Sequence, residues 1–141
     1  MCGITGILNL DGAPVSTSVL ERMTDVVSHR GPDGEGFWTN GCVGLGHRRL
    51  AIIDLSPLAH QPMQSADGAL VITYNGEIYN FQNLRVELES KGYAFNSQSD
   101  TEVLLHAYRE WGQACVHRLI GMFAFAIWDK RARQLFLARD R

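Results

Sequence analysis

Turn signals cut this chain into short apolar segments, and that pattern limits the folds open to it. Asp11-Gly12 and Asp67-Gly68 are strong turn pairs, and the glycine-rich stretch 31–36 with its proline is expected to be a loop. Between these breaks lie short runs of residues that favour strands. We expect strands at residues 2–9, 36–39, 42–47, 50–54, 70–75, 122–129 and 135–139, the last two forming a hairpin.

Helical periodicity marks three further segments. We expect helices near residues 18–27, at 81–91 and at 101–111. Their start signals are two capping-box pairs and one asparagine cap: Ser18 with Glu21, Ser99 with Glu102, and Asn80. Helices and strands come in mixed order, with hairpin signals between several strands. The pattern therefore favours an α+β fold of antiparallel sheets covered by helices over a parallel sheet of β-α-β units.

The composition is that of one globular domain. The 141 residues are 45% hydrophobic and 20% charged, with a formal net charge of −2. That balance argues against nucleic acid or an anionic membrane as the main partner, because both need a basic face. No apolar run approaches the roughly 18 residues of a membrane span, and the first residues lack the basic start of a signal peptide. We therefore expect a cytoplasmic protein.

The cysteines and histidines do not form a metal-binding or disulfide pattern. Cysteines stand at 2, 42 and 115, and no Cys-x-x-Cys pair occurs. The five histidines show no metal-ligand spacing either. We expect no metal site.

Cys2 stands directly after the initiator methionine. If Met1 is removed, this residue holds both a thiol and a free α-amine, whose reference pKa values are about 8.5 and about 7.7–8.0. The amine can then take the thiol proton, which gives a nucleophile with its own base. A small buried cysteine in a first strand is the alternative interpretation of the same residue.

Asn75-Gly76 follows the strongest apolar strand. A side-chain amide beside a glycine N–H offers two neutral donors that can stabilise an oxyanion. Taken alone, the pair is better explained by a plain Asn-Gly turn.

Two charged residues complete the candidates. Arg48 and Arg49 stand next to each other where the strands expected at 42–47 and 50–54 meet. In extended backbone, adjacent side chains point to opposite faces, so one of the two faces the interior or a cleft and needs a carboxylate partner. That partner is either a ligand or a carboxylate of the chain, such as Asp33 or Asp54. Asp100 is explained by helix capping and by the helix dipole, or by binding a substrate ammonium.

Seven segments in this order resemble the N-terminal glutaminase domain of the asparagine synthase-type, class II glutamine amidotransferases, which are N-terminal nucleophile hydrolases. The matching segments are Met1–Ile4, His29–Gly36, Gly46–Asp54, Tyr74–Asn80, Ser99–Glu102, Gly121–Ala126 and Ala138–Asp140. The resemblance implies a four-layer αββα sandwich of two antiparallel sheets flanked by helices.

The resemblance also implies a role for each candidate. Cys2 becomes the nucleophile, with its amine as base, and Asn75 and Gly76 form the oxyanion hole. Arg49 binds the α-carboxylate of L-glutamine and Asp100 its α-ammonium. The remaining residues of the implied glutamine pocket are Leu50, Ala51, Ile52, Ile53 and Glu77.

The implied activity is release of ammonia from glutamine through a Cys2 thioester. The glutaminase step needs no cofactor, whereas ATP and Mg are used by a C-terminal synthetase domain of the same longer chain, which amidates a carboxylate, with aspartate to asparagine as the expected reaction. A different acceptor, or a non-catalytic regulatory domain of the same fold, is the alternative. The resemblance is also compatible with a homodimer. We expect the domain 1–141 to be incomplete at its C-terminus.

Overall fold

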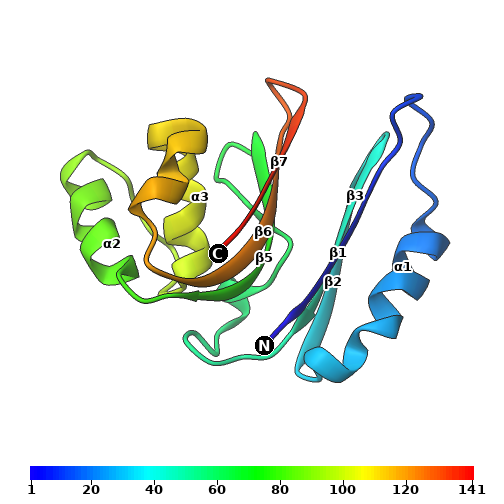
Figure 1. Ribbon diagram of the computed structural model, residues 1–141, viewed down its shortest axis with the longest axis horizontal. Coiled ribbons are helices and arrows are strands. Elements are labelled where there is room, and N and C mark those ends of the chain that lie inside the picture. Colours follow the sequence, from blue (N-terminus) through cyan, green and yellow to red (C-terminus); the bar gives the residue numbers. More distant parts are fainter.

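Two antiparallel sheets pack face to face, with helices on both outer faces (Figure 1). The computed structural model describes residues 1–141. One sheet has the order β1-β3-β2 and consists of β1 (Gly3–Leu8), β2 (Gly34–Asn40) and β3 (Val43–Arg49). The other has the order β4-β5-β6-β7 and consists of β4 (Met63–Gln64), β5 (Leu70–Ile78), β6 (Gly121–Asp129) and β7 (Gln134–Arg139). Every strand pair is antiparallel, as expected.

The helices complete the four layers. In Figure 1, α1 covers the three-stranded sheet, while α2 and α3 cover the four-stranded sheet. The α-helices are α1 (Thr17–Val26), α2 (Phe81–Ser90) and α3 (Asp100–Trp111). Short 3₁₀ segments are η1 (Ser28–Arg30), η2 (Pro57–Ala59) and η3 (Gly112–Arg118). The expected αββα sandwich is confirmed. No helix is long and apolar enough to cross a membrane.

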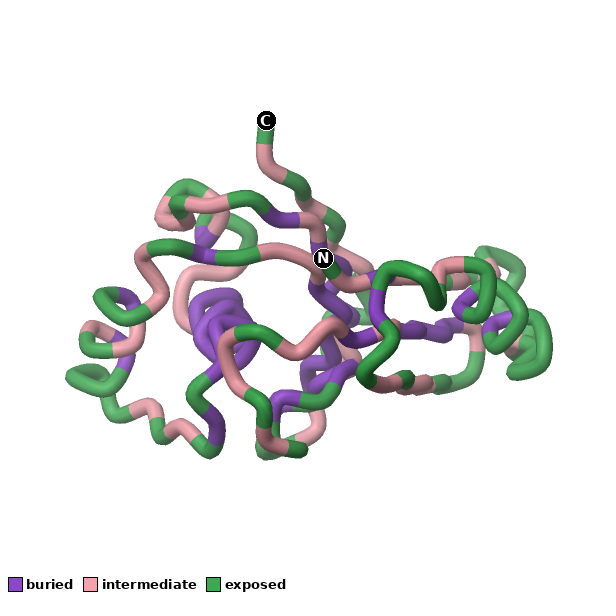
Figure 2. Tube along the Cα trace, turned by 90° about the horizontal axis from the view of Figure 1, so that it is seen from below, coloured by how far each residue is buried: buried purple, intermediate pink, exposed green.

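The main core lies between α3 and the four-stranded sheet. Residues from Asp100 to Tyr108 of α3 are buried, and Figure 2 shows this helix as a largely buried coil inside the molecule. Strand β5 is buried on both faces, because Ile72 faces the helices while Val71 packs in the smaller cluster between the two sheets. This two-sided burial explains why β5 begins with the apolar run Leu70–Ile72, and it holds in place the strand that carries Asn75.

The strand predicted at 50–54 does not exist. Strand β3 ends at Arg49, because the first residues of its two antiparallel neighbours pair with Arg48 and Arg49. Gly3 pairs with Arg48 and Gly34 with Arg49, so the chain beyond has no partner for a ladder. The apolar run Leu50–Ile53 resembles a strand in sequence, but it forms an irregular segment that is free to line a cavity.

The loop predicted at 31–36 is also shorter than expected, since β2 already begins at Gly34. A Cβ atom at Gly36 would lie 2.0 Å from the carbonyl oxygen of Gln61, so glycine is needed there for close approach of two backbones. At Gly36, the glycine therefore indicates that two backbone segments pack closely, and it does not indicate a loop.

One of the three predicted caps is wrong, because the N-cap of α1 is Ser16. Asn80 is the N-cap residue of α2 as predicted, but its side chain makes no capping bond to this helix. The Asn80 amide instead accepts from the Ile120 N–H and donates to the Arg118 carbonyl. Only Ser99 makes a side-chain capping bond, accepting from the Glu102 N–H at 3.3 Å.

Candidate active site

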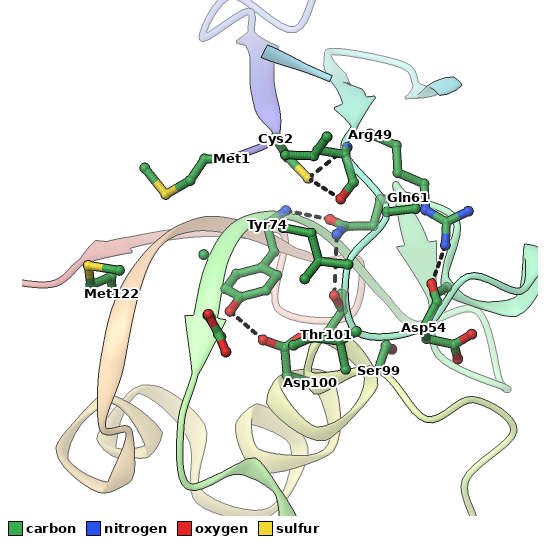
Figure 3. Close-up of a pocket in the computed structure, with 17 residues that line it drawn as sticks. Met1, Cys2, Arg49, Asp54, Gln61, Tyr74, Ser99, Asp100, Thr101 and Met122 are labelled. Atoms are coloured by element: carbon green, nitrogen blue, oxygen red, sulfur yellow. Dashed lines mark hydrogen bonds between the residues drawn. The ribbon is translucent and has the colours of Figure 1, made fainter. Parts of the chain in front are cut away.

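A cavity of about 120 Å³ lies where the start of β1, the segment after β3, the end of β5 and the start of α3 meet. Figure 3 shows Cys2, Arg49 and Asp100 reaching it from three different elements. It brings together nearly all the residues singled out from the sequence: Cys2, Arg49, Leu50, Ala51, Ile52, Ile53, Gly76, Glu77 and Asp100. These residues are separated by up to 98 positions along the chain, so only the fold makes them neighbours.

Cys2 is held at the edge of this cavity by the first residue after β3. Its Sγ accepts from the Leu50 N–H at 3.3 Å and lies 3.6 Å from the Leu50 carbonyl oxygen, to which it donates. The thiol is half-buried and unoxidised. While Met1 is attached, the Cys2 nitrogen is an amide and cannot serve as a base. The proposed chemistry therefore depends on removal of Met1.

The two adjacent arginines face opposite ways, as predicted. Arg48 pairs with Asp25 and Glu35 on the outer side. Arg49 is 8% exposed, and its guanidinium donates to the carbonyl oxygens of Asp54 and Ser56. It forms no ion pair, so the alternative of an internal salt bridge is wrong. A buried, unpaired guanidinium at a cavity wall suits a ligand carboxylate.

Asp100 supplies the opposite charge. It is 4% exposed, and its Oδ2 accepts from the Tyr74 hydroxyl at 2.7 Å and from the Ile78 N–H at 3.1 Å. Burial raises the pKa of this carboxyl, against the lowering effect of these hydrogen bonds. No basic side chain pairs with it, and a ligand cation would favour the charged form. Helix capping alone does not explain Asp100, because Ser99 occupies the cap position.

Asn75 and Gly76 lie at the end of β5. The Oδ1 atom of Asn75 is buried without a hydrogen-bond partner, and Asn75 does not line the cavity itself. Its neighbour Thr73 bonds to Gly46 of β3 at 3.1 Å, and strand alternation puts Asn75 on this same face. The amide therefore points toward the three-stranded sheet, which begins with β1 next to Cys2.

Gly76 lines the cavity and packs tightly against β6. A Cβ atom at this position would lie 2.2 Å from the Met122 carbonyl oxygen. Glycine is thus required for the close contact of β5 and β6. Glu77, the next residue, is exposed at the cavity rim.

Gln61 is a pocket residue that sequence reasoning missed. Its side chain is buried; Oε1 accepts from the Tyr74 N–H at 2.6 Å and Nε2 donates to the Thr101 hydroxyl at 3.2 Å. Gln61 therefore ties β5 to the first turn of α3. The only sequence signal was a polar side chain directly before Pro62, at the end of a loop and near an apolar strand.

No group of three or more His, Cys, Asp or Glu side chains is arranged to hold a metal ion. At the cavity, the side chains of Cys2, Arg49 and Asp100 are each held by their own hydrogen bonds.

The whole chain matches one protein family. The family model described as "Glutamine amidotransferase domain" matches residues 1–141. The chain belongs to this family. The family assignment inferred from the seven sequence segments is thereby confirmed.

Curated relatives of this glutamine amidotransferase domain are much longer proteins. "Asparagine synthetase [glutamine-hydrolyzing] 3" of Bacillus subtilis (strain 168) is 46% identical over 144 residues, which cover 100% of this chain and 23% of the relative. "Amidase chry2" of Gibberella zeae is 38% identical over 154 residues, with 100% of this chain and 23% of the relative covered. The chain spans about a quarter of the length of these relatives.

A solved structure supports the fold of the glutamine amidotransferase domain. The glutamine phosphoribosylpyrophosphate amidotransferase from B. subtilis superposes with a TM-score of 0.79 at 22% identity. The match covers 97% of this chain and 37% of that protein. At this identity the similarity establishes the fold alone, the sandwich of two antiparallel sheets flanked by helices.

Proposed function

We propose that this domain hydrolyses L-glutamine to glutamate and ammonia, with Cys2 as the nucleophile. One observation carries the proposal: Arg49 and Asp100 are both buried, neither is ion-paired, and both line the cavity that Cys2 enters. Burying a charge costs free energy unless a group of opposite charge, here from a ligand, pairs with it. A zwitterionic α-amino acid offers a carboxylate for Arg49 and an ammonium for Asp100.

The reaction proceeds in two steps. After Met1 is removed, the α-amine of Cys2 takes the thiol proton, and Sγ attacks the side-chain carboxamide of glutamine. The developing oxyanion is stabilised by the Asn75 amide and the Gly76 N–H. The tetrahedral intermediate collapses, the C–N bond breaks, and ammonia leaves with the proton that the amine had accepted. Water then attacks the thioester carbonyl, which releases glutamate and restores the thiol.

Each atom in this sequence is supplied by glutamine, water or Cys2, so we propose that the glutaminase step uses no cofactor. A nucleophilic thiol needs a reducing compartment, and all three cysteines are free. The cytoplasm is therefore the location we propose.

Ammonia released here would serve an acceptor carboxylate in a longer protein. We propose a C-terminal synthetase domain that activates the acceptor with ATP and Mg, and the name of the Bacillus relative supports aspartate as that acceptor. The Gibberella relative is similarly long, but its name is "Amidase chry2" and does not mention asparagine. This name favours a second candidate function, a glutaminase domain that serves a different acceptor.

The test is ammonia release from glutamine by the chain lacking Met1, combined with mass spectrometry after reaction with a diazo-ketone analogue of glutamine. We expect an adduct on Cys2, and no ammonia release by Cys2→Ala although the fold is retained. Cys42→Ala is the matched control, since Cys42 is also free and half-buried but lies outside the cavity. Full activity in Cys2→Ala, or an adduct elsewhere only, would refute the mechanism.

A further inference from the structure

Asp54 joins two segments that meet at the cavity. Its Oδ1 accepts from the Ser56 N–H at 2.8 Å, within its own segment. Its Oδ2 accepts from the Gln98 N–H at 2.8 Å, 44 positions away and directly before the cap of α3. No other hydrogen bond joins residues 50–56 to residues 96–99. One half-buried carboxylate therefore links these two parts of the chain.

Each end of this link lies next to one of the two buried charges. The guanidinium of Arg49 donates to the Asp54 and Ser56 carbonyl oxygens, so the Asp54 turn holds it in place. At the other end, Gln98 precedes Asp100 by two residues. A movement of Asp54 would therefore change where Arg49 lies relative to Asp100.

Packing holds the second half of this segment weakly. Ile53 is half-buried, but Ile52 is 67% exposed and Leu55 is 73% exposed, so these side chains contribute little burial. The first half is held by Asp33, whose Oδ2 accepts from the Ala51 N–H at 2.9 Å. The second half depends on Asp54. Hydrogen bonding from Ser56, and after it from Gln98, holds the pKa of Asp54 below its usual range, so the carboxylate stays charged and keeps both acceptors.

We infer that Asp54 is a positioning residue that sets the separation between the Arg49 guanidinium and the Asp100 carboxylate, and thereby selects substrates that carry both an α-carboxylate and an α-ammonium. The inference rests on the proposed glutaminase function and adds a specificity determinant to it. Two charges recognise a zwitterion jointly only when their separation is fixed, because binding one end must position the other. A substrate with a single charged end gains nothing from the fixed separation.

The test compares three amides: L-glutamine, its analogue without the α-amino group, and its analogue without the α-carboxylate. For Asp54→Ala we expect the KM for glutamine to rise about tenfold with kcat nearly unchanged, since ground-state and transition-state binding are lost equally. For each single-ended analogue, kcat/KM should change less than about twofold. Preference for glutamine over both analogues therefore falls about tenfold.

Gln98→Ala is the matched control. The Gln98 side chain is exposed and makes no hydrogen bond, while its N–H remains available to Asp54. We expect wild-type values for all three amides. Asp54→Asn keeps the size of the side chain and one acceptor oxygen, so it should give an intermediate loss of preference. It also keeps the proposal testable if Asp54→Ala does not fold.

The outcomes separate this inference from the function it rests on. A wild-type chain without Met1 that releases no ammonia from glutamine overturns both. An active wild-type chain whose preference among the three amides is unchanged in Asp54→Ala and Asp54→Asn overturns the positioning role alone. An equal loss on all three amides also overturns it, because that result indicates a general structural defect.

Discussion

Tyr74 makes hydrogen bonds to three different elements through three different groups. Its N–H donates to the Gln61 side chain, its carbonyl oxygen lies 3.2 Å from Nε2 of His47, and its hydroxyl donates to Asp100. A single residue thus connects β5 to the loop before β4, to β3 and to α3. Only the hydroxyl bond involves a group that the proposed reaction uses directly, so it can be removed alone.

Tyr74→Phe should weaken glutamine use about tenfold in kcat/KM, since hydrogen bonds to charged groups contribute about 1.5–3 kcal/mol. Loss of the donor destabilises the ionised carboxylate, so the pKa of Asp100 rises further above its usual range. The acid limb of the pH profile for kcat/KM should therefore move to higher pH.

The control for this prediction is Tyr79→Phe, because Tyr79 is 55% exposed and its hydroxyl makes no hydrogen bond. If the acid limb of Tyr74→Phe coincides with that of the wild type, Asp100 does not need the tyrosine to stay ionised.

At the scale of elements, α3 differs from the other helices in how its start is held. Ser99 caps it, and the buried Glu102 carboxylate accepts from the N–H groups of Asn96 and Ser97 and from the Ser97 hydroxyl. Helix α1, in contrast, begins at Ser16 without a side-chain cap. The rigid start belongs to the helix that presents Asp100.

Ser99→Ala should lower the free energy of unfolding by about 1 kcal/mol, the usual cost of losing a serine N-cap. Ser16→Ala should have almost no effect, because the Ser16 hydroxyl bonds only to the Ser18 hydroxyl and not to the helix backbone. Urea unfolding of both variants checks the difference. Equal destabilisation of the two would mean that the cap of α3 contributes nothing specific.

For the whole molecule, His47 is one of the contacts that connect the two sheets. It is 1% exposed on β3, and its ring lies 3.2 Å from the Tyr74 carbonyl oxygen of β5. A carbonyl oxygen can only accept, so Nε2 carries the proton. Burial, with a smaller contribution from the nearby Arg49 and His60 charges, lowers the pKa of His47 to about 4. The ring is therefore neutral in the folded protein at neutral pH.

This lowered pKa predicts acid sensitivity. Between pH 6.5 and about 4 the unfolded chain binds a proton at this histidine and the folded chain does not, so stability falls as the pH falls. From pH 7.5 to pH 5 the loss due to His47 should be about 2 kcal/mol. Burial of His106 acts in the same direction, and the raised pKa of Asp100 acts in the opposite direction.

His47→Gln isolates the contribution, because the glutamine amide can donate to the same carbonyl but does not titrate. Urea unfolding at both pH values should show a loss about 2 kcal/mol smaller in the variant than in the wild type. Identical losses in the two proteins would exclude His47 as the titrating group.

Much of the fold could be read from local patterns. The β6–β7 hairpin, the three α-helices and the antiparallel sheets follow from turn pairs and periodicity, because those signals act over a few residues. The failures share a cause. Leu50–Ile53 resembles a strand, yet the strands beside β3 pair with it only as far as Arg48 and Arg49. The amide of Asn80 bonds to the segment before β6 and not to its own helix. In both cases the structure depends on contacts with residues that are distant in the sequence.

By itself, the sequence determined which residue types were present for the chemistry: a cysteine at position 2, an inward arginine and an acidic residue at a helix start. Only the tertiary structure decided that Arg49 and Asp100 are buried without ion pairs at one cavity, and that Gln61 and Asp54 hold the elements around it. The physical reason is that a charge becomes a recognition site through what surrounds it. Desolvation and missing partners are properties of packing, and packing joins residues far apart in the chain.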